Sequence, residues 1–242
     1  MTADPWFLAA VFVVAVVSGA TASLVGFGIG SLLTPLMASR LGMDVAVAAV
    51  MVPHAIATAF RCWRLRASID RGVLIRFGLL SAAGGLAGAL LYTRLAPRML
   101  AQVLGALLLL TATAQLTGWS RRWRPHGTAV PALGLASGLF GGLAGNQGGL
   151  RAAALSAFDL GPAAFVATAT ATGLLVDLAR APVYLWTAGP QLLELAAPLA
   201  IATAGVLIGT VAGERILMGL SPARFARGVG AAIGALGIWL LV

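Results

Sequence analysis

The stretches Gly26-Phe27-Gly28-Ile29-Gly30 and Gly145-Asn146-Gln147-Gly148-Gly149 decide the fold, because each places a cluster of glycines inside long apolar sequence. Each cluster is predicted to interrupt a helix. Hydrocarbon cannot hydrogen-bond a freed backbone amide, so an interrupted helix survives inside a bilayer only where it is buried in protein or lines a polar cavity. We therefore expect the two clusters to mark a functional site.

The composition around these clusters is that of a polytopic membrane protein. Of the 242 residues, 60% are hydrophobic and 10% are charged, and the mean hydropathy is +0.98. These values exclude a soluble domain. Apolar stretches of the ~20 residues that a spanning helix needs recur along the whole chain, so we expect one membrane domain. No positive charge precedes the first apolar run, so we expect no cleaved signal peptide.

Hydropathy, read together with proline, glycine and arginine positions, predicts an all-α fold. Residues 28–41 and 148–160 are too short to cross a bilayer comfortably, so each is expected to be a half-helix or re-entrant arm that follows a glycine break. About eight full transmembrane helices are expected beside them, near 6–25, 43–64, 72–93, 97–118, 128–145, 162–187, 190–214 and 221–242.

An internal repeat relates the two halves of the chain. Matching residues lie 119 positions apart up to about residue 61, and 125 positions apart beyond a six-residue slip. The pairs with most weight are Ser18-Gly19 with Ser137-Gly138, Arg61 with Arg180, and Pro97 with Pro222. We predict a first membrane repeat at 1–118, a basic cytoplasmic linker at 119–127, and a second membrane repeat at 128–242.

The net charge of +9 comes from arginines that crowd three connections, and not from a nucleic-acid surface. Short basic loops stay in the cytoplasm. An odd number of crossings in each half puts all three connections on that side, inverts the halves relative to each other, and leaves both termini outside the cytoplasm. Inverted repeats are typical of alternating-access carriers. The connections contain Arg61, Arg64, Arg66, Arg71 and Arg76; Arg121, Arg122 and Arg124; and Arg215, Arg224 and Arg227.

The glycine motifs resemble the TauE/SafE sulfite exporter family, also called the toluene sulfonate uptake permeases. The likeness lies in the first cluster followed by Pro35, in Gly84-Gly85 with Gly88, and in the second cluster, and it covers nearly the whole chain. It implies a multi-pass carrier of the bacterial inner membrane that moves sulfite or organosulfonate anions, coupled to an ion gradient. Ala154 stands where many members have a second proline, so we expect a divergent Gly-Asn-Gln-Gly branch.

The residues themselves also point to an anion site. A half-helix that begins after a glycine break presents free amide hydrogens and the positive end of its dipole. Side-chain amides and one guanidinium stand beside the breaks. Alternatively, the glycines only allow close helix packing. The predicted substrate-binding residues are Gly26, Gly28, Gly30, Asn146, Gln147, Gly148, Gly149, Arg151 and, more weakly, Thr168.

Other ionisable residues within the apolar segments have open roles. Arg151 can grip two anion oxygens or can extend its side chain to the interface. Asp177 and Arg180 can form a structural i,i+3 pair, or Asp177 can carry a coupling proton or cation. His54 suits a proton relay or can bond a backbone carbonyl. Arg61 is interpreted as a cytoplasmic orientation charge.

These observations predict a secondary transporter of small anions that works by alternating access with a coupling proton or sodium ion. A passive anion channel can use the same parts, and a non-transporting scaffold is the remaining alternative. Two histidines, one cysteine and scattered acids give an intramembrane enzyme little chemistry. The predicted partners are a small anion and membrane lipid, with no metal, no cofactor and no nucleic acid.

Overall fold

The computed structural model describes residues 4–118, 125–216 and 222–242, and these residues are helical without any strand. The predicted all-α class is confirmed. A 3-10 turn (Arg66–Ser68), α4 (Arg71–Val73) and a π-helical turn (Leu74–Gly78) lead into α5. The other helices are α1 (Pro5–Val25), α2 (Ile29–Leu41), α3 (Met43–Leu65), α5 (Leu79–Tyr92), α6 (Pro97–Thr117), α8 (Ala129–Ala144), α9 (Gly148–Leu155), α10 (Pro162–Glu194), α11 (Ala196–Ile216) and α12 (Pro222–Leu241).

Six helical stretches among the described residues are long and apolar enough to cross a membrane. They contain α1, α3, α4 with α5, α6, α10 and α11. Two shorter apolar helices, at Ala129–Ala144 and Arg227–Leu241, occupy the other segments for which we predicted full crossings. Repeated apolar helices of this length indicate a multi-pass membrane protein.

The predicted basic connections are described only in part. The first connection carries exposed arginines, as does Arg227 in the third. Arg121, Arg122 and Arg124 lie outside the described residues, and the side chains of Arg215 and Arg224 are also outside the description.

Glycine ends two helices at the predicted breaks. α1 ends at Gly26, whose φ of 82° is left-handed, and Gly28 has a φ of 136° just before α2. α8 ends in the same way at Gly145, with a φ of 71°. Residues with a side chain rarely adopt these conformations. The predicted interruption of the helix at both clusters is therefore confirmed.

Two predicted helix ends are wrong. α9 stops at Leu155 and not near residue 160, because the amides of Ala157 and Phe158 bond carbonyls three residues back and the Ser156 hydroxyl donates to the Ala153 carbonyl at 2.6 Å. α10 continues past residue 187 and through Pro190 to Glu194. A proline removes one donor and bends a helix, and it does not have to end that helix.

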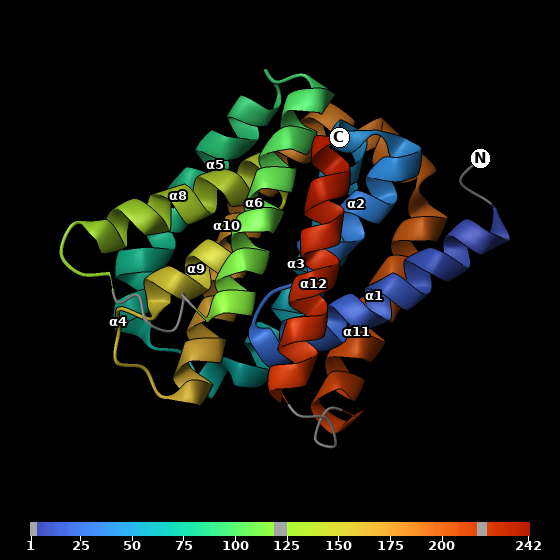
Figure 1. Cartoon of the computed structure of the whole chain (residues 1–242). Coiled ribbons are helices and arrows are strands. Elements are labelled where there is room, and N and C mark those ends of the chain that lie inside the picture. The colour runs from blue at the N-terminus through green and yellow to red at the C-terminus, as the bar shows by residue number, and fades with distance from the viewer. Residues whose placement is uncertain (1–3, 119–124, 217–221) are drawn as a thin grey trace.

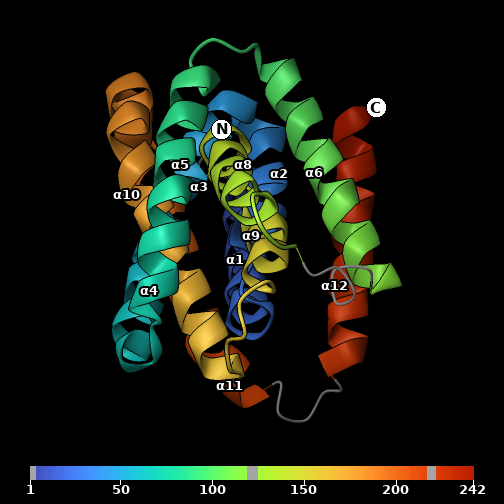
Figure 2. The ribbon, with the colours of Figure 1, turned by 90° about the vertical axis from the view of Figure 1, so that its left-hand side faces the viewer.

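Helices of the first half pack on helices of the second half throughout the molecule. α5 lies against α8, α1 against α11, α6 against α12, and α3 against α10. Figure 1 shows α1 and α11 crossing together at one side, and Figure 2 shows α6 beside α12 along the right-hand edge of that view. The 119-residue offset relates α1 to α8, and the 125-residue offset relates α5 to α11. The α1–α11 crossing is therefore equivalent to the α8–α5 crossing.

The correspondence extends to single backbone atoms at these crossings. A β-carbon at Gly19 of α1 would meet the carbonyl of Val206 in α11, and one at Gly138 of α8 would meet the carbonyl of Ser81 in α5. In the same way, Gly209 faces the carbonyl of Val16 and Gly84 faces that of Leu135. Each glycine and each carbonyl has its repeat mate in the other crossing. Gly84 and Gly209 therefore allow close helix packing.

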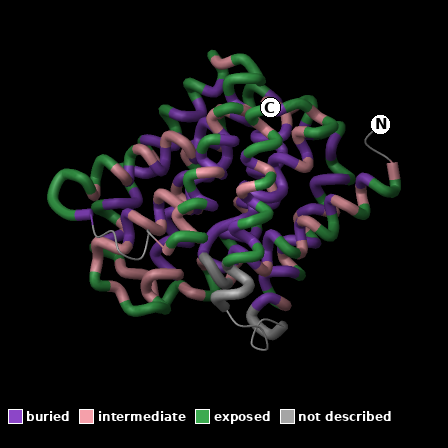
Figure 3. The backbone as a smooth tube through the Cα atoms, in the orientation of Figure 1, coloured by how far each residue is buried: buried purple, intermediate pink, exposed green. Residues whose placement is uncertain are grey.

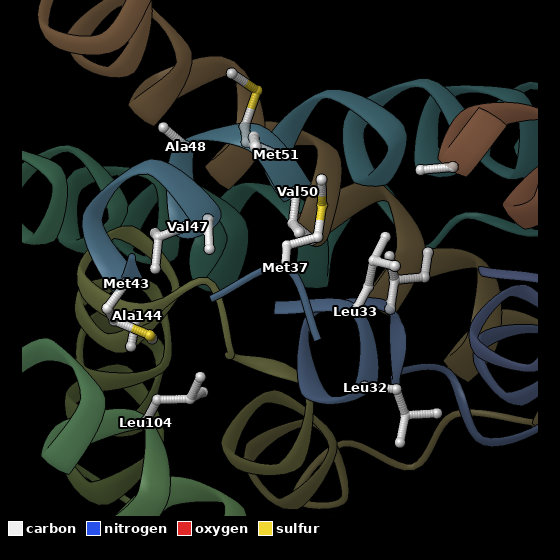
Figure 4. Packing of buried hydrophobic residues seen from close by; sticks show 14 of the residues in the cluster. Leu32, Leu33, Met37, Met43, Val47, Ala48, Val50, Met51, Leu104 and Ala144 are labelled. Atoms are coloured by element: carbon white, nitrogen blue, oxygen red, sulfur yellow. The ribbon is translucent and has the colours of Figure 1, made fainter. Parts of the chain in front are cut away.

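The core lies where α2 enters the centre of the bundle. Buried residues line the inner faces of the helices, and exposed residues follow their outer faces (Figure 3). α2 is buried along most of its length by α3 and α1. Figure 4 shows Leu33 and Met37 of α2 near Val50 and Met51 of α3. This packing fixes the start of α2, and hence the first glycine break, inside the protein.

Candidate functional site

The two glycine breaks line one small shared hollow. Added β-carbons would make Gly30 meet the Gly145 carbonyl and Gly148 meet the Phe27 side chain, so the breaks also touch each other. Of the predicted site residues, Gly149 is beside the hollow, where its β-carbon would meet Thr111 of α6. The lining residues are Ala22, Gly26, Phe27, Gly28, Ile29, Gly30, Ser31, His54, Arg61, Gly145, Asn146, Gln147, Gly148 and Arg151.

Two helices begin at the wall of this hollow. α2 starts at Ile29 and α9 starts at Gly148, and neither has a side-chain cap on its first turn. The first amides of a helix have no intrahelical acceptor, and the helix dipole gives that end a partial positive charge. The hollow is therefore bordered by two helix ends that favour negative charge.

The side-chain amides beside the second break are buried with open hydrogen-bonding positions. Asn146 is 5% exposed and Gln147 is 4% exposed. Asn146 Oδ1 accepts a weak bond from Ser31 Oγ at 3.4 Å, while its Nδ2 and both polar atoms of the Gln147 side chain have no partner within the described residues. Buried donors without acceptors are uncommon and costly. They leave the site prepared for an added acceptor.

Arg151 is buried at the wall of the hollow. It is 3% exposed, so the alternative in which it extends to the interface is wrong. One terminal nitrogen donates to the Gly26 carbonyl at 3.3 Å, and the other, Nη1, has no partner in the described part of the chain. A β-carbon at Gly173 of α10 would meet Nη1, so this glycine gives the guanidinium its room. Arg151 thus joins the second break to the end of α1.

A buried carboxylate connects His54 with Arg180. Nδ1 of His54 lies 2.6 Å from Asp177 Oδ2. Arg180 donates to Asp177 Oδ1 from Nε at 3.1 Å and from Nη2 at 2.8 Å. Of these three residues only His54 lines the hollow. The backbone-carbonyl partner that we considered for His54 is replaced by a carboxylate from another helix.

Arg180 also anchors α10 to α8 just before the second break. Its Nη1 donates to the Gly141 carbonyl, and the hydroxyl of Tyr184 donates to the Gly142 carbonyl. The guanidinium carbon lies 5.6 Å from the centre of the Tyr184 ring. These contacts tie α10 to the end of α8.

Arg61 also lies at the hollow, although its sequence context predicted a cytoplasmic orientation charge. It is 5% exposed and lines the hollow, so the interpretation as a loop charge is wrong. α3 continues past it to Leu65, which keeps Arg61 on a helix and lets its side chain turn inward. The pairing of Arg61 with Arg180 in the repeat was the available signal, because Arg180 lies in the middle of an apolar segment.

Thr168 does not join the hollow. Its side chain is fully buried, and its hydroxyl accepts a hydrogen bond from the Asp70 amide at 3.0 Å. This contact ties α10 to the turn after α3. The position of Thr168 therefore gives no support to the weak prediction that it binds substrate.

The scan against family models matches residues 11–240 to the sulfite exporter TauE/SafE family. The chain belongs to the TauE/SafE sulfite exporter family. The match covers nearly the whole chain, so it includes both glycine breaks and the hollow between them. The comparisons with curated proteins and with solved structures gave no match. This TauE/SafE chain is therefore a multi-pass membrane transporter by family, as its glycine motifs indicated.

Proposed function

We propose that this protein is a secondary transporter that binds a small anion, sulfite or an organosulfonate, between the two helix breaks and carries it by alternating access. The observation that carries the proposal is the set of unused donors around one hollow. Asn146 Nδ2, Gln147 Nε2 and Arg151 Nη1 are buried with no acceptor in the described part of the protein. A bound oxyanion supplies those acceptors.

The charge of the hollow favours the same occupant. Arg61 and Arg151 line it, and no carboxylate does so within the described residues. Two guanidinium groups and two helix N-termini in a buried site attract an anion strongly, because little water screens them. A sulfite or sulfonate group has three oxygens, so it can bond a guanidinium and the neighbouring amides together.

Alternating access rests on the relation between the halves. The matching contacts of Gly19 with Val206 and of Gly138 with Ser81 support a duplicated, inverted arrangement of two membrane repeats. In this arrangement eight helices cross the membrane and two broken helices meet near its middle. The basic connections then lie in the cytoplasm and both termini outside it, in a bacterial inner membrane.

A thermal-shift screen of purified protein in detergent tests anion binding. Sulfite, sulfate, thiosulfate, taurine and sulfoacetate are compared with carboxylates at equal ionic strength. We expect at least one sulfur oxyanion to raise the unfolding temperature in a saturable way. The absence of stabilisation by every anion would remove the hollow as a binding site.

Flux into proteoliposomes separates a carrier from a channel. We expect uptake of the stabilising anion to depend on a proton or sodium gradient, whereas flux through a passive channel is independent of both gradients.

The variants Gly28→Leu and Gly148→Leu test the scaffold alternative, because a side chain is strained at position 28 and meets Phe27 at position 148. Folded variants with undiminished anion binding would favour a scaffold.

A further inference from the structure

We propose that His54 is the coupling site, and that one proton binds at its Nε2 together with each anion. The inference rests on the proposed anion site, since it assigns the coupling ion and the residue that carries it. Asp177 acts as a positioning residue that holds the imidazole in one orientation. The structural basis is a relay of three buried groups that meets the hollow only at the histidine.

Asp177 determines which nitrogen of His54 is left for the proton. The carboxylate is fully buried, and Arg180 already donates twice to its Oδ1. Its Oδ2 lies 2.6 Å from Nδ1 of His54, so Nδ1–H donates to that oxygen. A neutral imidazole with its proton on Nδ1 has an unprotonated Nε2. The nitrogen available to the hollow is then an acceptor.

An acceptor at the wall of an anion site opposes the anion. The lone pair of Nε2 repels an oxyanion, whereas Nε2–H⁺ donates a charge-assisted hydrogen bond to it. Protonation at Nε2 leaves Nδ1–H on Asp177 undisturbed, so the ring gains charge without changing its orientation. The proton comes from the solvent that reaches the hollow and returns to solvent from Nε2 when the anion leaves. Asp177 stays a carboxylate throughout.

The neighbouring charges make proton and anion depend on each other. Arg61 of α3 and Arg151 of α9 line the same hollow, and Arg180 and Asp177 of α10 form a pair behind the ring. Two other helices that pack against α3 each have one charged residue. In α2 this is Arg40, which pairs with Asp4, and in α6 it is the exposed Arg98. The side chains of Glu214 and Arg215 at the end of α11 lie outside the description.

Two arginines oppose a third positive charge in the empty hollow, and a bound anion removes that opposition. Binding of the anion therefore favours protonation, and protonation favours binding by the same factor. His54 is the single entry to the relay within the described residues, since its side chain is 11% exposed and that of Asp177 is 0% exposed. An anion and a proton that can be bound only together are transported together.

Two variants replace the titratable imidazole of His54 by an amide that does not titrate. His54→Asn retains an amide donor near the position of Nδ1, and His54→Gln retains a neutral donor near the position of Nε2. His126→Gln is the matched control, because His126 is the other histidine of the chain and lies in an exposed position outside the hollow. Isothermal titration in buffers of different ionisation enthalpy measures the protons taken up per bound anion.

The titrations use thiosulfate and methanesulfonate, whose charges are constant between about pH 5.5 and 8.5, a range that includes histidine titration. For the wild type and His126→Gln we expect uptake approaching one proton per anion, with affinity falling up to about tenfold per pH unit as the pH rises. For His54→Asn and His54→Gln we expect binding that no longer depends on pH and no proton uptake. Sulfite is analysed as the difference between wild type and His54→Gln.

The outcomes separate this inference from the proposed function. Binding by the wild type without proton uptake overturns the inference and leaves the anion site in place, as does pH dependence that persists in both His54 variants. No binding of any anion by the wild type removes the anion site and the inference together. If neither His54 variant folds, the wild-type titration with thiosulfate still tests the inference. That anion takes up no proton itself, so binding without proton uptake overturns the coupling.

Discussion

The two helix breaks occupy equivalent places in the two halves, but they bring different chemistry to the hollow. Apart from the Ser31 hydroxyl, the first break supplies backbone and apolar groups, with Phe27 and Leu32 at the places where the second has Asn146 and Arg151. Both breaks retain glycine where the chain turns left-handed. The contrast indicates that both breaks have the geometry of an interrupted helix, while only the second break carries amide and guanidinium side chains at the wall of the hollow.

The equivalent helices α3 and α10 differ in the opposite sense, because here the first half supplies the charged side chains at the hollow. In α10, Arg180 is neutralised by Asp177 and directed to the backbone of α8. In α3, the position equivalent to Asp177 is Thr58, and Arg61 and His54 line the hollow. Gly173 is the repeat mate of His54, and its missing side chain gives Arg151 its space. The first half therefore contributes its cations from α3, and the second half contributes its own from the break.

The largest expected effect is a loss of folding stability, and it should distinguish Arg180 from Arg61, its equivalent in the first half. Arg180→Met leaves the buried Asp177 carboxylate with the neutral His54 imidazole as its hydrogen-bond donor and without its guanidinium partner, which costs about 3–5 kcal/mol of folding free energy. Arg61→Met is expected to weaken anion binding more than it lowers stability, because Arg61 lines the hollow. Thermal unfolding in detergent with and without thiosulfate measures both. Equal destabilisation by the two variants would contradict a division of roles.

Arg151→Ala tests the difference between the breaks directly. Loss of a charge-assisted hydrogen bond costs about 1.5–3 kcal/mol, so anion affinity should fall by roughly tenfold or more while the fold is retained. Leu32→Ala, at the equivalent place in the first half, should lower stability and leave the anion affinity nearly unchanged. Retained anion-dependent stabilisation in Arg151→Ala would exclude this residue from the site.

Gln147→Met tests the side-chain amides of the second break. Replacing one neutral donor by an apolar group of similar length should cost about 1 kcal/mol of anion binding, or roughly fivefold in affinity. Gln115→Met on α6 is a matched control, because its amide atoms are also buried without a partner in the described part of the chain, yet it does not line the hollow. If both variants bind the anion equally well, the amide is not a ligand.

Thr168→Val is expected to have the smallest effect. It removes the acceptor of the Asp70 amide and so should cost about 0.5–1.5 kcal/mol of stability, with no change in anion affinity. Its repeat mate is Ala49, which already lacks a hydroxyl. Titration of the variant with thiosulfate checks the affinity. Weaker binding with unchanged stability would return Thr168 to the site.

Much of the fold follows from local features of the sequence. Most helix starts and the breaks at Gly26 and Gly145 were predictable, because glycine and proline act on the backbone of their own segment, although α11 begins at Ala196 and not near residue 190. The end of α9 and the continuation of α10 through Pro190 were not predictable, since these depend on turn hydrogen bonds and on packing with neighbouring helices. Arg61 was misassigned for a similar reason: charge patterning places a residue near a membrane boundary and does not say which way its side chain points.

The sequence by itself determined an all-helical membrane chain with two glycine breaks, and it contained the repeat and the family motifs, because these depend on hydropathy and on the backbone freedom of single residues. Only the tertiary structure decided that both breaks face one hollow, that His54 meets Asp177 from another helix, and that Arg61 turns inward. The contacts between the two breaks and between His54 and Asp177 join residues more than 110 positions apart, so they depend on how helices cross and on which faces they bury.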